Sequence, residues 1–117
     1  MAQHLRAWIA YSGFDGRLYF WRTQKGNEVD FVVYGAGGFW AIEVMNSRRI
    51  RPQDLSGLRT FAGDYPECTP ALVYRGSDRL AIDGIQCLPG EEFLRQLRPS
   101  RPLLEPLPSA TRGSLPG

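Results

Sequence analysis

The sequence is short of the residues that build several common kinds of site. Among its 117 residues it has one histidine, His4, one lysine, Lys25, and two cysteines, Cys68 and Cys87, which stand far apart. This inventory excludes a zinc centre made of cysteines and histidines. We expect both cysteines to be buried or half-buried thiols rather than a disulfide.

Long apolar runs are also lacking. No stretch approaches the roughly 20 residues needed to cross a bilayer, and the N-terminus does not have the basic-then-apolar layout of a signal peptide. We therefore expect a cytoplasmic protein that does not enter a membrane. The net charge of +2 is too small to indicate nucleic-acid binding by itself, although 13 of the 14 basic residues are arginines.

What is present predicts one folded domain and a tail. Hydrophobic residues make up 43% and charged residues 22% of the chain, close to the average for soluble domains, and the length leaves room for one core. Five of the nine prolines fall in residues 98–117 without periodicity. We expect an α/β domain over residues 1–97, followed by a proline-rich tail over 98–117 that is disordered or loosely docked.

The spacing of apolar residues and turn signals predicts the order αβββαβββα. Helices are expected over residues 3–11, 52–62 and 89–97, and strands over 17–23, 28–34, 39–45, 71–74, 80–82 and 85–88. Three strands joined by short connections predict an antiparallel meander. The helix after the third strand favours a parallel fourth strand, so the central sheet is expected to be mixed and flanked by helices.

Strand alternation gives each of the second and third strands one face that is less apolar than the other. It places Val29, Phe31 and Val33 opposite Glu28, Asp30 and Val32 in the second strand, and Trp40, Ile42 and Val44 opposite Phe39, Ala41, Glu43 and Met45 in the third. If residues 35–38 form the loop, Tyr34 pairs with Phe39 and Asp30 lies directly across from Glu43, with β-carbons about 4.5–5.5 Å apart.

Two carboxylates in this position repel each other. The repulsion favours a bound cation, a neighbouring arginine or a shared proton between them. Oxygen ligands from two acids and water suit Mg²⁺ or Mn²⁺. The alternative is a pair of solvent-facing polar residues on a half-exposed sheet.

The motifs around these acids resemble a known family. They are YFWRT at 19–23, GNEVDFV at 26–32 and AIEVM at 41–45, with LVYRG at 72–76 and DGI at 83–85. They are similar to the C-terminal domain, of unassigned function, of prokaryotic AAA+ family ATPases. That domain is itself similar to PD-(D/E)XK phosphodiesterases, which include restriction endonucleases and archaeal Holliday-junction resolvases. The resemblance extends from about Gln3 to Leu97 and implies a restriction endonuclease-like fold beside an ATPase module of the same parent protein.

The resemblance also implies roles for individual residues. In the nucleases a strand-borne Asp and Glu hold the metal, and a lysine two residues after the Glu orients or activates the attacking water. Asp30 and Glu43 match the two acids, while Met45 stands at the lysine position and its thioether cannot supply a charge. Glu28 shares a face with Asp30 and is a candidate auxiliary ligand, or a solvated strand end.

Other groups expected at such a site are displaced or lacking. Lys25 lies five residues before Asp30, roughly 15 Å along a strand. Arg22 or Arg48 could supply charge but are poor bases. The fold normally takes another acid from its first helix, and no acid precedes Asp15. We therefore expect an excised C-terminal domain with a truncated first helix, whose tail is either the natural terminus or vector-derived.

Arg48, Arg49 and Arg51 form a cluster just before the second predicted helix. Cations are unfavourable at the positive end of a helix dipole unless an anion is bound there. A phosphate of DNA or of a nucleotide would fit, and a solvated arginine run is the alternative.

Three functions compete. The first is a degenerate nuclease-like domain that binds Mg²⁺ or Mn²⁺ weakly and does not cleave. The second is a non-enzymatic module for protein interaction or oligomerisation, for which a homodimer is one form. The third is an active metal-dependent DNA nuclease in which an arginine replaces the lysine.

Overall fold

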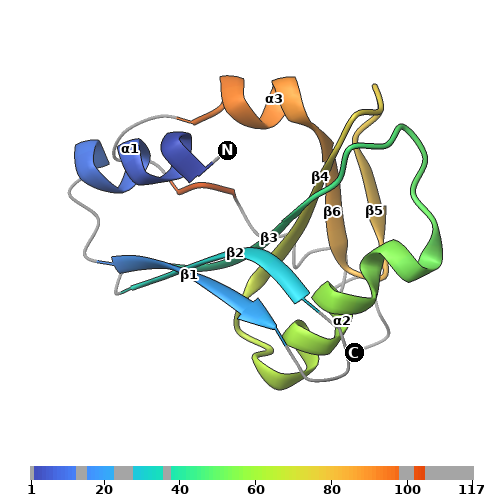
Figure 1. Ribbon diagram of the computed structural model, residues 1–117, viewed down its shortest axis with the longest axis horizontal. Coiled ribbons are helices and arrows are strands. Elements are labelled where there is room, and N and C mark those ends of the chain that lie inside the picture. Colours follow the sequence, from blue (N-terminus) through green and yellow to red (C-terminus); the bar gives the residue numbers. More distant parts are fainter. Residues whose placement is uncertain (1, 13–15, 23–27, 36–37, 98–101, 105–117) are drawn as a thin grey trace, which may run out of the picture.

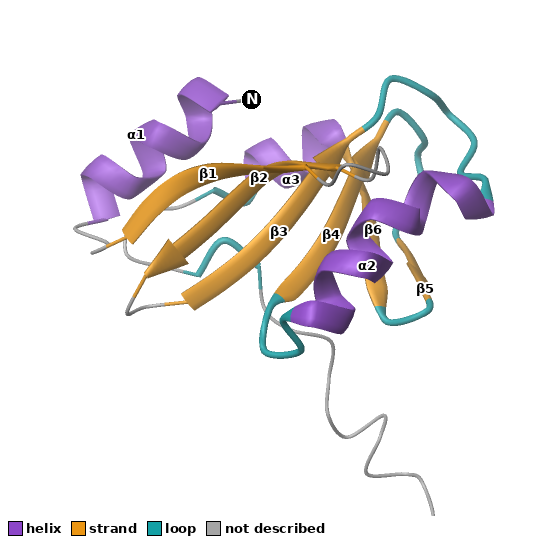
Figure 2. Cartoon of the chain, turned by 60° about the horizontal axis from the view of Figure 1, so that its bottom comes forward, coloured by secondary structure: helices purple, strands orange, loops and turns teal. Residues whose placement is uncertain are grey.

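The computed structural model describes residues 2–12, 16–22, 28–35, 38–97 and 102–104. Its elements are α1 (Ala2–Ser12), β1 (Gly16–Arg22), β2 (Glu28–Gly35), β3 (Gly38–Val44), the 3₁₀ turn η1 (Pro52–Leu55), α2 (Ser56–Asp64), β4 (Thr69–Tyr74), β5 (Leu80–Ile82), β6 (Ile85–Pro89) and α3 (Gly90–Arg95). They form one six-stranded sheet in the order β1-β2-β3-β4-β6-β5, with α1 and α3 on one face and α2 on the other (Figures 1 and 2). The predicted element order and the mixed sheet are confirmed. No helix in the described ranges is long and apolar enough to span a bilayer.

The first three strands form the predicted antiparallel meander. Tyr34 pairs with Phe39, as predicted, but pairing continues to Gly35 and Gly38, which were expected in the loop. Gly38 has a steric reason to be glycine. A β-carbon there would lie 2.3 Å from Cη2 of Trp40, so the missing side chain lets the indole lie over the end of the hairpin.

The second half of the sheet is parallel at its centre. β4 pairs in parallel with both β3 and β6, and β5 returns antiparallel to β6. The parallel placement of β4 beside the meander is therefore confirmed. The β5–β6 hairpin turns through Asp83 and Gly84, which have φ values of 53° and 78°. Positive φ at both central residues is the requirement of a tight hairpin turn, and Asp-Gly satisfies it.

Each face of the sheet carries its own apolar core. The core on the α1 face contains Leu5, Trp8, Val33, Trp40, Ile42, Ala71, Val73, Leu88, Phe93, Leu103 and Leu104. The core on the α2 face contains Val29, Val32, Ala41, Leu55, Leu58, Phe61, Cys68, Leu72, Tyr74, Ile85 and Cys87. Strands buried on both faces lose the simple polar alternation, which explains why β4 is apolar from Pro70 to Val73.

A bulge in β2 overturns part of the predicted face assignment. Val29 was expected opposite Val32, yet both lie in the core on the α2 face. The pairing of β1 with β2 shifts by one residue between Tyr19↔Val32 and Trp21↔Val29. Two β2 residues therefore face one β1 residue, which reverses the alternation beyond that point. Periodicity alone does not reveal such an insertion.

Leu103 and Leu104 belong to the core of the domain. Leu103 and Leu104 are 1% and 4% exposed. The indole Nε1–H of Trp40 donates to the Leu104 carbonyl at 2.9 Å, and the Gln96 amide donates to the Leu103 carbonyl at 3.3 Å. The tail was expected to be disordered or loosely docked, and at Leu103 and Leu104 it is docked, because two buried leucines and a carbonyl acceptor hold the chain. The rest of 98–117 lies outside the described residues.

Leu103→Ala tests the contribution of this segment. We expect it to lower the free energy of unfolding by about 2–5 kcal/mol, because it removes a buried side chain from a packed core. Urea unfolding followed by circular dichroism measures the change. Leu80→Ala is the matched control, since Leu80 is 42% exposed. Equal losses in the two variants would contradict the packing of Leu103.

Candidate functional site

β2 and β3 separate from each other at one end of the sheet. Their backbone pairing runs from Gly35↔Gly38 to Phe31↔Ile42. Beyond that pair β2 stays bonded to β1, and β3 stays bonded to β4 through Glu43 and Val44. β2 stays paired with β1, and β3 stays paired with β4, so β2 and β3 diverge beyond the Phe31–Ile42 pair. We name this divergence the fork. The fork begins where the β2 bulge lies.

Asp30 and Glu43 meet at this fork. Oε1 of Glu43 accepts a hydrogen bond from the backbone N–H of Asp30 at 2.9 Å, and Oδ2 of Asp30 accepts one from the N–H of Val44 at 2.8 Å. Both acids are half-buried. Their carboxylates replace the ladder bonds that the strands no longer make, and hydrogen bonds to a charged acceptor are stronger than neutral ones. The structure thus brings the predicted acid pair together.

The fork offers hard oxygen ligands. An ionised carboxylate has about four acceptor sites, so one backbone N–H does not exhaust it. Mg²⁺ keeps several waters and needs only one or two carboxylates, which two acids on adjacent strands can provide. Within the described residues there is no group of three or more His, Cys, Asp or Glu side chains that could hold a metal ion. The backbone of Glu28 lies in β2, while its side chain lies outside the described part.

Met45 lies beyond the end of β3 and packs inward. Its side chain is half-buried against the core on the α2 face, and its N–H donates to the Val73 carbonyl at 2.8 Å. The position that the nuclease resemblance assigns to lysine is therefore used for apolar packing. Of the suggested replacements, Arg48 is exposed on the loop after β3, while the Arg22 side chain and Lys25 lie outside the described part.

A family model covers the whole of this site. Residues 1–93 match the model described as Domain of unknown function (DUF4143). The chain belongs to the DUF4143 family. Comparisons with curated proteins and with solved structures gave no match. The family description assigns no activity, so the roles of Asp30, Glu43 and Met45 stay predictions.

In this DUF4143 domain the arginine cluster lies on the surface before η1. Arg48, Arg49 and Arg51 are all exposed. The N–H of Arg51 donates to Oδ2 of Asp54 at 2.7 Å, and the Arg51 guanidinium Nε lies 3.7 Å from the same oxygen. The Asp54 carboxylate thus already places a negative charge at the first turn of η1. This weakens the argument that the helix dipole requires a bound phosphate beside the arginines. Contact with nucleic acid remains a prediction.

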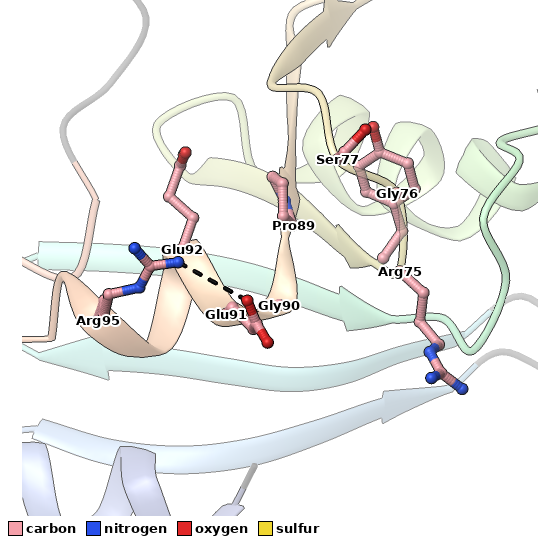
Figure 3. A pocket seen from close by; sticks show the side chains of 9 residues that line it. Arg75, Gly76, Ser77, Pro89, Gly90, Glu91, Glu92 and Arg95 are labelled. Carbon is pink, nitrogen blue, oxygen red and sulfur yellow. Dashed lines mark ion pairs between the residues drawn. The ribbon is translucent and has the colours of Figure 1, made fainter.

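A polar pocket of about 550 Å³ lies where β4 and β6 end. It is lined by Tyr74, Arg75, Gly76, Ser77, Pro89, Gly90, Glu91, Glu92 and Arg95 (Figure 3). Arg95 pairs with Glu91 at 3.8 Å, and the Arg75 guanidinium donates to Asn46 Oδ1 at 3.0 Å. Lining charges of both signs leave the pocket without a clear preference for an anion or a cation.

A second hollow, here named the aromatic groove, was missed by sequence reasoning. Its volume is about 430 Å³, and its lining residues are Tyr19, Trp21, Val32, Tyr34, Phe39, Phe61, Tyr65 and Glu67. They come from β1, β2, β3, α2 and the turn that follows α2. The sequence did predict that Tyr34 and Phe39 face each other across two strands, which is one part of the groove. It did not predict the groove itself, because the rings of α2 reach these two residues only through tertiary packing.

Both thiols of the DUF4143 domain are buried and free, as predicted. Burial, with a smaller contribution from Glu67, raises the pKa of Cys68 to about 11. Burial also raises the pKa of Cys87. Since the folded-state pKa of Cys68 lies above its ordinary value of 9.0, burial of the neutral thiol contributes fully to stability below that pH. This contribution is lost as the pH rises through about 11. Neither thiol is an activated nucleophile.

Alkylation tests this assignment. In Cys87→Ala, which leaves Cys68 as the single thiol, we expect iodoacetamide at pH 8.5 to react about a hundredfold more slowly than after denaturation, because the reactive thiolate is scarce. Mass spectrometry at timed intervals measures the rate. Equal rates in the folded and denatured chain would contradict the burial of Cys68.

Proposed function

We propose that this chain is a degenerate PD-(D/E)XK nuclease-like domain that binds Mg²⁺ or Mn²⁺ weakly at Asp30 and Glu43 and does not cleave DNA. The proposal includes its place as the C-terminal domain of an AAA+ type ATPase, whose ATPase module is its partner. The observation that carries it is the β2–β3 fork, where two half-buried carboxylates from adjacent strands each reach across to the opposite backbone.

The electrostatics of the fork support a cation there. Two carboxylates that each accept a hydrogen bond from the opposite strand hold their negative charges close together, and like charges at this spacing repel. A hydrated divalent ion between them would offset this repulsion. Its affinity would be low, because a two-carboxylate site leaves most of the coordination shell to water.

The absence of cleavage follows from Met45. Hydrolysis of a phosphodiester needs charge stabilisation and a group that positions or deprotonates water. A thioether packed against the α2-face core does neither. An arginine from the exposed 48–51 cluster could bind a phosphate, but its high pKa makes it a poor base. Our proposal for this surface is therefore contact with DNA without cleavage.

A second candidate function is supported by the aromatic groove. Tyr19, Tyr34 and Tyr65 are 46%, 53% and 42% exposed, although they adjoin buried rings. Such a surface, with an apolar body and polar tips, is typical of protein interaction sites. The groove therefore favours an interaction module, which is compatible with a metal site at the fork.

Calorimetric titration with Mn²⁺ tests the metal site. We expect millimolar-range binding by the native chain and none by Asp30→Asn, which removes the charge but keeps an oxygen for the Val44 N–H. Asp64→Ala is the control, because Asp64 is an exposed acid at the end of α2. Circular dichroism shows that each variant is folded. Heat that persists unchanged in Asp30→Asn would eliminate the proposal.

Cleavage assays test the degeneracy of the site. We expect supercoiled plasmid and branched DNA to remain intact after long incubation with the native chain and Mn²⁺, because the lysine position holds Met45. Gel electrophoresis measures nicking. Cleavage that disappears in Asp30→Asn would show an active nuclease and refute the degenerate assignment.

A further inference from the structure

The rings that line the aromatic groove pack against one another, and three of its tyrosines are exposed to solvent. The ring of Phe39 contacts those of Tyr34, Phe61 and Tyr65 at centroid distances of 4.7, 5.8 and 5.8 Å, and Trp21 contacts Phe61 at 5.1 Å. Because these rings hold one another edge to face, the groove is formed before any ligand arrives.

The chemistry of the lining favours a proline-rich segment. Aromatic grooves bind extended polyproline helices, which are already ordered and lose little entropy on docking. Among the residues that the structure describes, the charged residue in the lining is Glu67. A negative charge at the edge of the groove disfavours a nucleic-acid backbone, so we choose a proline-rich segment over stacked nucleotides as the occupant.

The chain carries a suitable segment close by. Leu104 is fixed to the Trp40 indole on the α1 face. That indole lies over Gly38, at the end of the β2–β3 hairpin. Tyr34 and Phe39 line the groove on the other face of the same hairpin end. Leu104, the last described residue before this segment, thus lies across one sheet from the groove.

Length and charge both allow residues 105–117 to reach it. The segment contains three prolines, Pro106, Pro108 and Pro116. As a polyproline helix, thirteen residues span about 40 Å, against roughly 10 Å between stacked layers. Its charged residues are Glu105 and Arg112. The charge of Arg112 is opposite to that of Glu67 in the groove lining, so the two residues can form an ion pair.

We propose that the aromatic groove binds the proline-rich segment 105–117 of the same chain. The segment then covers the exposed tyrosines of the α2 face, and any external proline-rich partner must displace it. This proposal is independent of the metal site, because the groove shares no residue with the fork.

Paramagnetic broadening in the full chain tests the proposal. A nitroxide is attached to Ser109→Cys, where it reacts selectively because both native thiols are buried. We expect the amide signals of Tyr34, Tyr65 and Glu67 to lose most of their intensity, and those of Arg6 and Asp83 to keep theirs. Groove signals with the same intensity before and after reduction of the nitroxide would overturn the proposal.

Two further samples identify the occupant. When nitroxide-bearing chains without ¹⁵N are mixed with ¹⁵N-labelled native chains, we expect no broadening. Broadening in that mixture would show that the tail of a second copy fills the groove, and would refute docking within one chain. The double substitution Pro106→Ala and Pro108→Ala, added to the labelled chain, should restore most of the groove intensity. Undiminished broadening would show that the prolines are not the ligand.

Discussion

The pairing of β2 with β3 is the constraint on which the rest of the structure depends. Its register sets Tyr34 against Phe39 at the hairpin end, where the rings line the aromatic groove. The same register brings Asp30 to Glu43 at the other end, where the strands part. One antiparallel ladder therefore positions both candidate sites. A slip by one residue would move every side chain of a strand to the opposite face.

Most of the fold could be predicted from the sequence, because strand alternation and glycine-rich turns are local signals. The order of elements, the mixed sheet and the facing acids all follow from them. The bulge opposite Phe20 could not be predicted, since nothing in the composition of β2 marks the extra residue, and it moved Val29 to the other face. The aromatic groove was missed for a different reason. It joins rings from three strands and a helix, and only packing brings them together.

Glu43 and Met45, near the end of β3, have different surroundings. Glu43 accepts a hydrogen bond from the backbone of β2, whereas Met45, two residues further on, packs into the α2-face core. Residues two apart on a strand point the same way, so this short stretch changes from polar to apolar within one face. An ammonium at position 45 would have to extend out of that core. The apolar packing of Met45 is thus compatible with the proposed degenerate site, in which no lysine occupies this position.

The hydrogen bond from the Trp40 indole to the Leu104 carbonyl helps to define where the folded domain ends. The DUF4143 match stops at residue 93, yet the interior of the α1 face is completed only by Leu103 and Leu104. A chain cut at the family boundary would expose the hollow these leucines fill and leave an indole donor without its acceptor. The physical limit of the domain therefore lies at least eleven residues beyond the limit drawn by family resemblance.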